Sequence, residues 1–281
     1  MAVILSGKEL SEKLTQEQKQ RVAELKAQGI HPGLAVVLVG EDPASTIYVR
    51  NKGIACETIG IHSETIRLPE DASQEQLEDT IQRLNEDKKI SGILVQLPLP
   101  KHLDEEAALA KILPEKDVDG FHLMNAGKLF TGQEGVIPCT PKGILYMLKE
   151  AGIELKGKEA VIIGRSNIVG KPAAMLLLQE HCTVTICHSR TQNLKEHARR
   201  ADILVAAIGK PRFVTADMVK PGAAVMDVGI NRVDGKVVGD VDYEPVSQVA
   251  GYITPVPGGI GKMTISMLME NTLEAACRQG R

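Results

Sequence analysis

The second half of the chain alternates short β-branched runs with helix-length segments, and this alternation limits the possible folds more than any other feature. Runs that fit buried strands lie at residues 159–164, 182–188, 202–208, 223–228 and 251–254. Strands that alternate with helices form a parallel sheet with both faces covered. The sequence therefore predicts a Rossmann-like, doubly wound domain in the C-terminal half.

The N-terminal half shows a looser form of the same alternation. Apolar runs that fit strands lie at residues 34–39, 63–68 and 92–97. A helix is expected over residues 44–59, ended by Gly60. Ser73 and Gln76 form a capping-box signature, which predicts another helix start. The chain as a whole is therefore expected to be an α/β protein.

A domain boundary is expected within residues 117–141, which are rich in Gly, Asn and Pro and have no clear period. Thr140 is expected to cap a helix that has Pro141 at its first position. The predicted domains are residues 1–138 and 139–281, with an active-site cleft between them. The last helix, within 264–281, is free to pack on the first domain.

Composition and charge argue against several classes of partner. The net charge is −3 and aromatic residues make up 2 %, with no Trp, so neither phosphate attraction nor base stacking favours nucleic acid. No apolar run reaches the roughly 18 residues of a membrane span, and the N-terminus lacks signal-peptide features. The five scattered cysteines form no C-x-x-C pair, so we expect no metal site and a cytoplasmic location.

The turn after the first C-terminal strand, G-R-S-N-I-V-G-K-P, is a candidate phosphate-binding loop that begins at Gly164. Backbone N–H groups at a helix start bind phosphate well. The usual G-x-G-x-x-G pattern would need glycine where Ser166 stands, so the loop alone is a weak signal. The alternative is that Gly164 only makes a tight turn.

The end of the next strand, His188-Ser189-Arg190, has no carboxylate to hold the ribose hydroxyls of NAD. Hydroxyl and guanidinium groups would instead bind a 2′-phosphate, and Arg165 adds a second positive charge. NADP is therefore favoured over NAD. The alternative is that Arg190 is a solvated loop charge.

Tyr48 and Lys52 lie one turn apart on a predicted inward stripe of the helix 44–59. The other members of this stripe are Ala44, Ala55 and Ile59. A lysine there needs a partner or a partly deprotonated amine. The alternative is a side chain that reaches to water at the domain edge.

Gln96 lies among apolar neighbours in V-Q-L-P-L-P, where a buried amide needs partners such as a lysine or a substrate. Asp117 and Asp119 are spaced two apart in K-D-V-D-G. Turn chemistry, with each carboxylate bonded to its own local backbone, explains these acids as well as a binding role does.

Taken together, the motifs resemble the bifunctional methylenetetrahydrofolate dehydrogenase/cyclohydrolase family. The matching stretches, in order, are P-A-S-x-x-Y-V-x-x-K, V-Q-L-P-L-P, K-D-V-D-G-F, P-C-T-P, G-R-S-x-I-V-G-x-P, H-S-R-T, D-V-G-I-N, V-G-D-V and T-P-V-P-G-G. The resemblance implies NADP-dependent oxidation of 5,10-methylenetetrahydrofolate to the methenyl form, followed by hydrolysis to 10-formyltetrahydrofolate. It also implies a homodimer that acts on tetrahydrofolate one-carbon derivatives, in the metabolism that supplies purine, methionine and histidine synthesis.

The resemblance also implies roles for individual residues. The catalytic positions correspond to Tyr48, Lys52, Gln96 and Asp119. The cofactor positions correspond to Gly164, Arg165, Ser166, Ser189, Arg190 and Ile230, and the substrate loop to Pro257, Gly258 and Gly259. The chain has Lys262 where the family usually has proline, which adds a charge at a helix start. Two alternatives remain: a dehydrogenase without the hydrolytic step, and a non-catalytic nucleotide sensor on the same scaffold.

Overall fold

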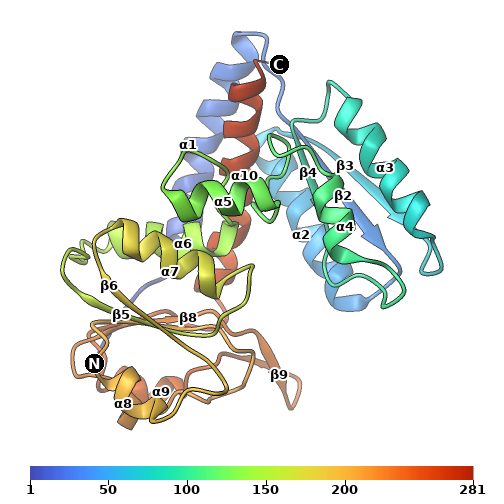
Figure 1. Ribbon diagram of the computed structural model, residues 1–281. Coiled ribbons are helices and arrows are strands. Elements are labelled where there is room, and N and C mark those ends of the chain that lie inside the picture. The colour runs from blue at the N-terminus through green and yellow to red at the C-terminus, as the bar shows by residue number, and fades with distance from the viewer. Residues whose placement is uncertain (281) are drawn as a thin grey trace. The chain divides into compact units, whose positions relative to one another are not determined.

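The computed structural model describes residues 1–280, apart from the side chain of Ala44. The chain forms two compact units, one of residues 1–12 with 140–264 and one of residues 13–139 with 265 onward. Figure 1 labels the elements of both units. Among residues 1–280, no helix combines the length and the apolar character needed to cross a membrane.

The unit of residues 1–12 and 140–264 contains a six-stranded parallel sheet in the order β1-β11-β8-β7-β5-β6. Its strands are β1 (Val3–Ile4), β5 (Glu159–Ile163), β6 (Thr183–Cys187), β7 (Ile203–Ala206), β8 (Ala224–Asp227) and β11 (Tyr252–Ile253). The strand order reverses at β5, which lies between β6 and β7. This confirms the predicted doubly wound, Rossmann-like sheet, in which ligands bind beyond the carboxyl ends of the strands at such a reversal.

Short helices and a hairpin complete this unit. The helices are α6 (Cys139–Glu150), α7 (Gly170–Gln179), α8 (Leu194–Arg199) and α9 (Tyr243–Ser247), with a 3-10 turn at Ala216–Met218, and the hairpin pairs β9 (Asn231–Val233) with β10 (Lys236–Val238). Every residue of β7 and β8 is buried, because both faces of a parallel sheet are covered. The N-terminal residues join this unit because β1 pairs with β11.

The other unit contains a three-stranded parallel sheet in the order β3-β2-β4. Its strands are β2 (Gly33–Val39), β3 (His62–Leu68) and β4 (Gly92–Val95), and its helices are α2 (Pro43–Ile59), α3 (Gln74–Glu86), α4 (Glu105–Lys111) and α5 (Leu123–Thr131). The central strand β2 is buried along its whole length. Ser73 and Gln76 form the predicted capping box at the start of α3.

Two long helices, α1 (Gly7–Ala27) and α10 (Ile260–Gln279), contribute residues 13–27 and 265–279 to this unit, where they run alongside each other (Figure 1). The buried side chain of Gln18 donates to the Ser266 carbonyl oxygen at 2.9 Å, and Arg21 pairs with Glu270. These contacts join α10 to α1 although some 250 residues separate them in the sequence.

Several local predictions were wrong. The segment 117–141 was expected to be irregular but contains α5, which starts after the cap of His122 and ends at Gly132 in the left-handed region. Composition hid this helix because its glycine and asparagine disfavour helix formation on their own. The strand expected to reach residue 97 ends at Val95, and α6 begins at Cys139, so Thr140 lies inside the helix. The last helix begins at Ile260, four residues before its expected start.

Candidate functional site

Helix α2 positions Lys52. The Asp42 carboxylate caps the helix start by accepting from the Ser45 N–H at 2.7 Å, and Gly60 ends the helix at φ 86°. The buried side chains of the helix are Ser45, Val49, Cys56 and Ile59. Lys52 falls on this row at helical spacing and is itself half-buried. Tyr48 lies beside the row and is 37 % exposed, so the inward stripe is rotated from the one predicted.

The Lys52 amine has a specific partner. Its Nζ donates to the Gln96 Oε1 at 2.9 Å, and the Gln96 Nε2 donates to the Leu97 carbonyl oxygen at 2.7 Å. Gln96 follows directly after β4, and its backbone N–H still bonds to the Val37 carbonyl oxygen. The lysine is therefore paired inside the unit, which decides against the alternative of a side chain that only reaches to water.

Asp117 has the turn role that was one of the two alternatives for this motif. It is 1 % exposed and accepts hydrogen bonds from the N–H groups of Gly120, Phe121 and His122, at 2.8–3.2 Å. The Asn125 Nδ2 adds a fourth at 2.9 Å. These donors occupy both carboxylate oxygens, so Asp117 organises the segment that leads into α5.

Asp119, two residues later, is in a different environment. The carboxylate is half-buried, and its Oδ1 accepts a hydrogen bond from the Cys139 thiol at 3.8 Å. Within the described residues it accepts none from a backbone N–H. Burial raises the pKa of the Asp119 carboxyl to about 6, opposed by the positive charge of Lys52 and reinforced by the negative charge of Asp117. The structure thus brings Asp119 within electrostatic range of the Lys52–Gln96 pair. Its carboxylate is not occupied by hydrogen bonds from the surrounding backbone of residues 1–280.

The predicted nucleotide positions lie beyond the carboxyl ends of β5, β6 and β8. Gly164 follows β5 at φ 131°, and a Cβ there would lie 2.2 Å from the Ala207 carbonyl oxygen, so the loops after β5 and β7 approach too closely for a side chain. The Ser166 hydroxyl accepts from the N–H groups of Val169 and Gly170 at 3.2 Å, which caps the start of α7. Arg165 is exposed beside it.

The turn after β6 presents Ser189 and Arg190 to solvent. The Arg190 N–H bonds to the His188 Nδ1 at 3.1 Å, which fixes the backbone of this turn. Ile230, after β8, is 49 % exposed and lies in the same unit. These side chains remain available to a ligand at the edge of the sheet.

The predicted substrate loop lies against the first turn of α1 in the same unit. The Lys8 N–H donates to the Gly258 carbonyl oxygen at 2.9 Å. A Cβ on Gly7 would lie 2.1 Å from the Gly259 carbonyl oxygen, so the two segments touch through their backbones. Pro257 is the exposed residue of this loop.

Two buried acids that the sequence reasoning left without a role join the loops after β7 and β8. Asp240, 0 % exposed, accepts from the N–H groups of Ile208 and Gly209 at 2.7 and 2.9 Å, and from the Asn231 Nδ2 at 2.9 Å. Asp227 accepts from the N–H groups of Gly229, Asp240 and Val241 at 2.8–3.0 Å. Burial raises the pKa of Asp227 to about 7 despite these donors, and the charge of Asp240 adds to the rise.

The glycines of D-V-G and V-G-D were the sequence signal for this network. A Cβ on Gly239 would lie 1.7 Å from the Asp227 Oδ2, and one on Gly229 would lie 2.2 Å from the Asp240 Oδ1. Carboxylates that press this closely on a neighbouring backbone require glycine. Among residues 1–280, no three His, Cys, Asp or Glu side chains are grouped so as to hold a metal ion.

Comparison with known proteins gives full-length matches. Residues 5–119 match the family model described as tetrahydrofolate dehydrogenase/cyclohydrolase, catalytic domain, and residues 138–280 match its NAD(P)-binding domain. The chain is 57 % identical, over all 281 residues and 98 % of the relative, to the bifunctional protein FolD of Bacillus cytotoxicus.

Solved structures match equally well. The bifunctional FolD methylenetetrahydrofolate dehydrogenase/cyclohydrolase of Campylobacter jejuni is 49 % identical with a TM-score of 0.98, over 99 % of this chain and 100 % of that one. The Trypanosoma brucei N5,N10-methylenetetrahydrofolate dehydrogenase-cyclohydrolase, solved with NADP cofactor and inhibitor, is 40 % identical with a TM-score of 0.95, over 100 % of this chain and 99 % of that one.

Proposed function

The chain belongs to the tetrahydrofolate dehydrogenase/cyclohydrolase family, and on that premise we propose how its residues carry out the family's two reactions. It is a bifunctional enzyme that oxidises 5,10-methylenetetrahydrofolate to the 5,10-methenyl form with NADP and then hydrolyses that product to 10-formyltetrahydrofolate. Residues 1–138, with the last helix packed on them, form the folate-binding catalytic domain, and the rest of residues 139–281 bind NADP. The observation that carries the proposal is the half-buried Lys52–Gln96 pair, at 2.9 Å, within electrostatic range of Asp119.

The residues present fit NADP. The close approach of the Ala207 carbonyl requires glycine at position 164, and the turn after β5 therefore offers a backbone without a side chain at the strand-order reversal, where phosphate binds. Gly164, Arg165 and Ser166 hold the pyrophosphate. Ser189 and Arg190 bind the 2′-phosphate, which a carboxylate at that position would repel. Ile230 supplies an apolar contact, and NADP, when bound, supplies the hydride acceptor.

Asp119 and Tyr48 recognise the folate. The aminopyrimidinone edge of a pterin carries two parallel N–H donors, and an ionised carboxylate accepts both. The Asp119 carboxylate suits this role because no backbone N–H within the described residues uses it. Tyr48, 37 % exposed, offers a ring face and a hydroxyl one helical turn from Lys52. Pro257, Gly258 and Gly259 form a loop whose backbone contacts the substrate.

Lys52 is proposed to serve both steps through its Nζ. Loss of hydride leaves positive charge on the one-carbon bridge, which a charged ammonium would oppose. One amine N–H is donated to the Gln96 Oε1, which orients the nitrogen lone pair. In the second step, the oxygen of water bonds to the methenyl carbon as one of the water protons passes to the Lys52 Nζ. The hydroxyl group so formed then releases its proton and becomes the formyl C=O, while the C–N5 bond breaks and N5 keeps the bond pair and takes up a proton.

The protein is proposed to act as a homodimer in the cytoplasm, without nucleic-acid or membrane partners. The resemblance to the family supports the dimer, and the net charge of −3 supports the absence of polyanionic partners. The products feed purine, methionine and histidine synthesis.

The decisive assay mixes the protein with methylenetetrahydrofolate and either NADP or NAD, and follows reduced cofactor and methenyl product separately. We expect reduction of NADP in preference to NAD, with the methenyl compound passing on to 10-formyltetrahydrofolate. Methenyl product that accumulates without formyl product would favour a dehydrogenase without the second activity. No turnover with either cofactor, although nucleotide binds, would favour the non-catalytic sensor.

The variant Lys52→Met tests the role of the amine. We expect cyclohydrolase activity to fall at least about 100-fold, because general base catalysis contributes roughly 10²–10⁴, while folate still binds. Arg50→Met is the matched control, since Arg50 is an exposed cation on the same helix and should keep both activities. Hydrolysis retained by Lys52→Met would remove Lys52 from this role.

A further inference from the structure

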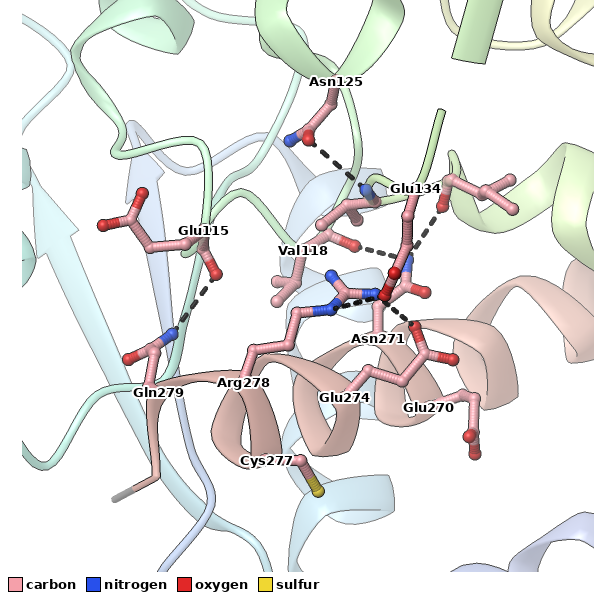
Figure 2. A network of polar contacts seen from close by, with 12 residues as sticks. Glu115, Val118, Asn125, Glu134, Glu270, Asn271, Glu274, Cys277, Arg278 and Gln279 are labelled. Atoms are coloured by element: carbon pink, nitrogen blue, oxygen red, sulfur yellow. Dashed lines mark hydrogen bonds and ion pairs between the residues drawn. The ribbon is translucent and has the colours of Figure 1, made fainter. Parts of the chain in front are cut away.

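A buried asparagine of α10 holds the segment that contains Asp119. Asn271 is 1 % exposed, and its Nδ2 donates to the Val118 carbonyl oxygen at 2.9 Å and to the Ile137 carbonyl oxygen at 2.9 Å. Figure 2 shows the amide directed at the Val118 carbonyl. The side-chain N–H₂ thus connects the residue just before Asp119 to the residue two before Cys139.

The two segments that Asn271 joins meet at Asp119. The Cys139 thiol donates to the same Val118 carbonyl oxygen at 3.4 Å and contacts the Asp119 Oδ1 at 3.8 Å. Gly120 follows at φ 75°, and a Cβ there would lie 2.7 Å from the Pro138 nitrogen. Asn271 therefore bonds to both backbone segments, 118–120 and 137–138, at the place where they are in contact next to Asp119.

The position of Asp119 depends on these Asn271 hydrogen bonds because its own carboxylate makes few contacts. Asp117 is held by four hydrogen bonds from its own segment. In contrast, the contact to the Asp119 carboxylate comes from Cys139, which is itself tied to Val118. The position of Asp119 is thus set by the backbone at Val118, whose carbonyl oxygen accepts a hydrogen bond from the Asn271 amide.

Other contacts from α10 to this part of the chain come from Arg278 and Gln279 near its end (Figure 2). The Gln279 Nε2 donates to the carbonyl oxygens of Ser91 and Glu115 at 2.8 and 3.2 Å, and Arg278 pairs with Glu134 at 3.7 Å. The exposed Arg278–Glu134 ion pair contributes little, and the half-buried Gln279 holds Ser91 and Glu115 rather than the residue next to Asp119. Asn271 is the buried contact, and it bonds to the residue next to Asp119.

We propose that Asn271 is a positioning residue for folate recognition, which places Asp119 by holding the Val118 and Ile137 carbonyls together. The inference rests on the proposed function, in which Asp119 accepts the N–H groups of the pterin. Asn271 itself touches no reacting atom. Its loss should weaken folate binding far more than NADP binding, because the nucleotide positions belong to the other compact unit.

The test compares Asn271→Ala with Thr272→Val. Thr272 is the matched control because it is the next residue of α10 and is 0 % exposed, and because its hydroxyl, among residues 1–280, bonds within its own helix to the Leu268 carbonyl oxygen at 2.8 Å. We expect Asn271→Ala to raise the KM for methylenetetrahydrofolate roughly 10- to 100-fold, as small misplacements of binding groups do. The KM for NADP should stay within about twofold. Thr272→Val should change neither KM.

A pH profile supplies a readout that a loss of stability alone would not move. The ionisable groups acting on Asp119 are Lys52 of α2, Asp117 of its own segment and Cys139 at the start of α6. Ionised Asp119 accepts the pterin donors, so folate affinity should fall as the pH drops below the raised Asp119 pKa of about 6. In Asn271→Ala, water reaches the loosened carboxylate, and this midpoint should move towards the ordinary aspartate value of about 4.

The outcomes separate the inference from its premise. Asp119→Asn should weaken folate binding, and if it does not, the assigned role of Asp119 fails and the inference fails with it. If Asp119→Asn weakens binding while Asn271→Ala keeps both the folate KM and the pH midpoint, only the inference is overturned. Should Asn271→Ala fail to fold, Asn271→Ser keeps one donor and should give an intermediate KM. A KM unchanged in Asn271→Ser would then overturn the inference.

Discussion

Each compact unit contains two buried or half-buried aspartates close to a glycine turn, and the two pairs differ in how their oxygens are used. In one unit, Asp227 and Asp240 each accept three hydrogen bonds from the neighbouring loops. In the other, Asp117 accepts four, whereas Asp119 takes no backbone N–H from the described residues.

The difference shows that burial alone does not identify an acid that binds a ligand. A carboxylate has about four lone-pair sites, so one that already accepts three or four hydrogen bonds has at most one left for a ligand. Asp119 is less buried than the other three but has unused acceptor capacity beside a lysine. Counting donors to each oxygen therefore separates the scaffold acids from the candidate binding acid.

The largest expected effect comes from breaking a scaffold acid in the nucleotide-binding unit. Asp240→Ala removes the acceptor for Ile208, Gly209 and Asn231. Each orphaned donor costs about 1–3 kcal/mol, so the free energy of unfolding should fall by at least about 3 kcal/mol in denaturant titrations. Asp242→Ala is the control, because its side chain makes no capping bond to α9, and it should change stability by less than about 0.5 kcal/mol. Equal stabilities would contradict the scaffold role.

The two acids of K-D-V-D-G should respond differently to the same substitution, with Asp117 affecting stability and Asp119 affecting folate binding. Asp117→Asn turns an amide N–H₂ towards donors such as the His122 N–H and the Asn125 amide. It should lower the free energy of unfolding by about 2 kcal/mol. Asp119→Asn should not lower the free energy of unfolding, and it should raise the KM for folate on the order of 100-fold, since a charge-assisted bidentate contact is lost. Thermal unfolding and folate titration of both variants check this, and parallel effects would erase the distinction between the two acids.

The smallest effect is a pH dependence of stability. The pKa values of Asp119 and Asp227, about 6 and about 7, lie above those of the unfolded chain. Between about pH 4 and these values, the folded protein keeps protons that the unfolded chain has lost, so these two acids make the free energy of unfolding fall as pH rises.

Asp119→Asn should remove its part of that slope, on the order of 1–2 kcal/mol between pH 4 and 7. Denaturant titrations at several pH values compare the variant with the unchanged protein. A slope that is identical in both would show that Asp119 is not protonated more readily in the folded state.

Local sequence patterns predicted most of the regular structure. The capping box at Ser73, the Gly60 helix end and all the predicted strands are present, because these features depend on neighbours within a few residues. The failures were short elements whose stability comes from packing. Helix α5 and strand β1 carry weak local signals and form where the rest of the fold supplies partners.

Tyr48 shows how a small angular error in the predicted buried face of α2 misplaces a residue. Helical periodicity placed both Tyr48 and Lys52 on the inward row, but the buried residue is Val49, one position after Tyr48. A shift of one residue is 100° around the helix. Only the packing of α2 against its sheet could fix that angle.

The sequence by itself determined the doubly wound sheet, the family, and the list of candidate residues, because these follow from local periodicity and from motifs that are contiguous in the chain. The tertiary structure decided which of those residues are in contact and which carboxylates are already occupied by hydrogen bonds from the protein. The Lys52–Gln96 pair and the hold of Asn271 on Val118 join residues 44 and 153 positions apart, respectively. Contacts over such separations depend on how whole elements pack, and no local pattern records that.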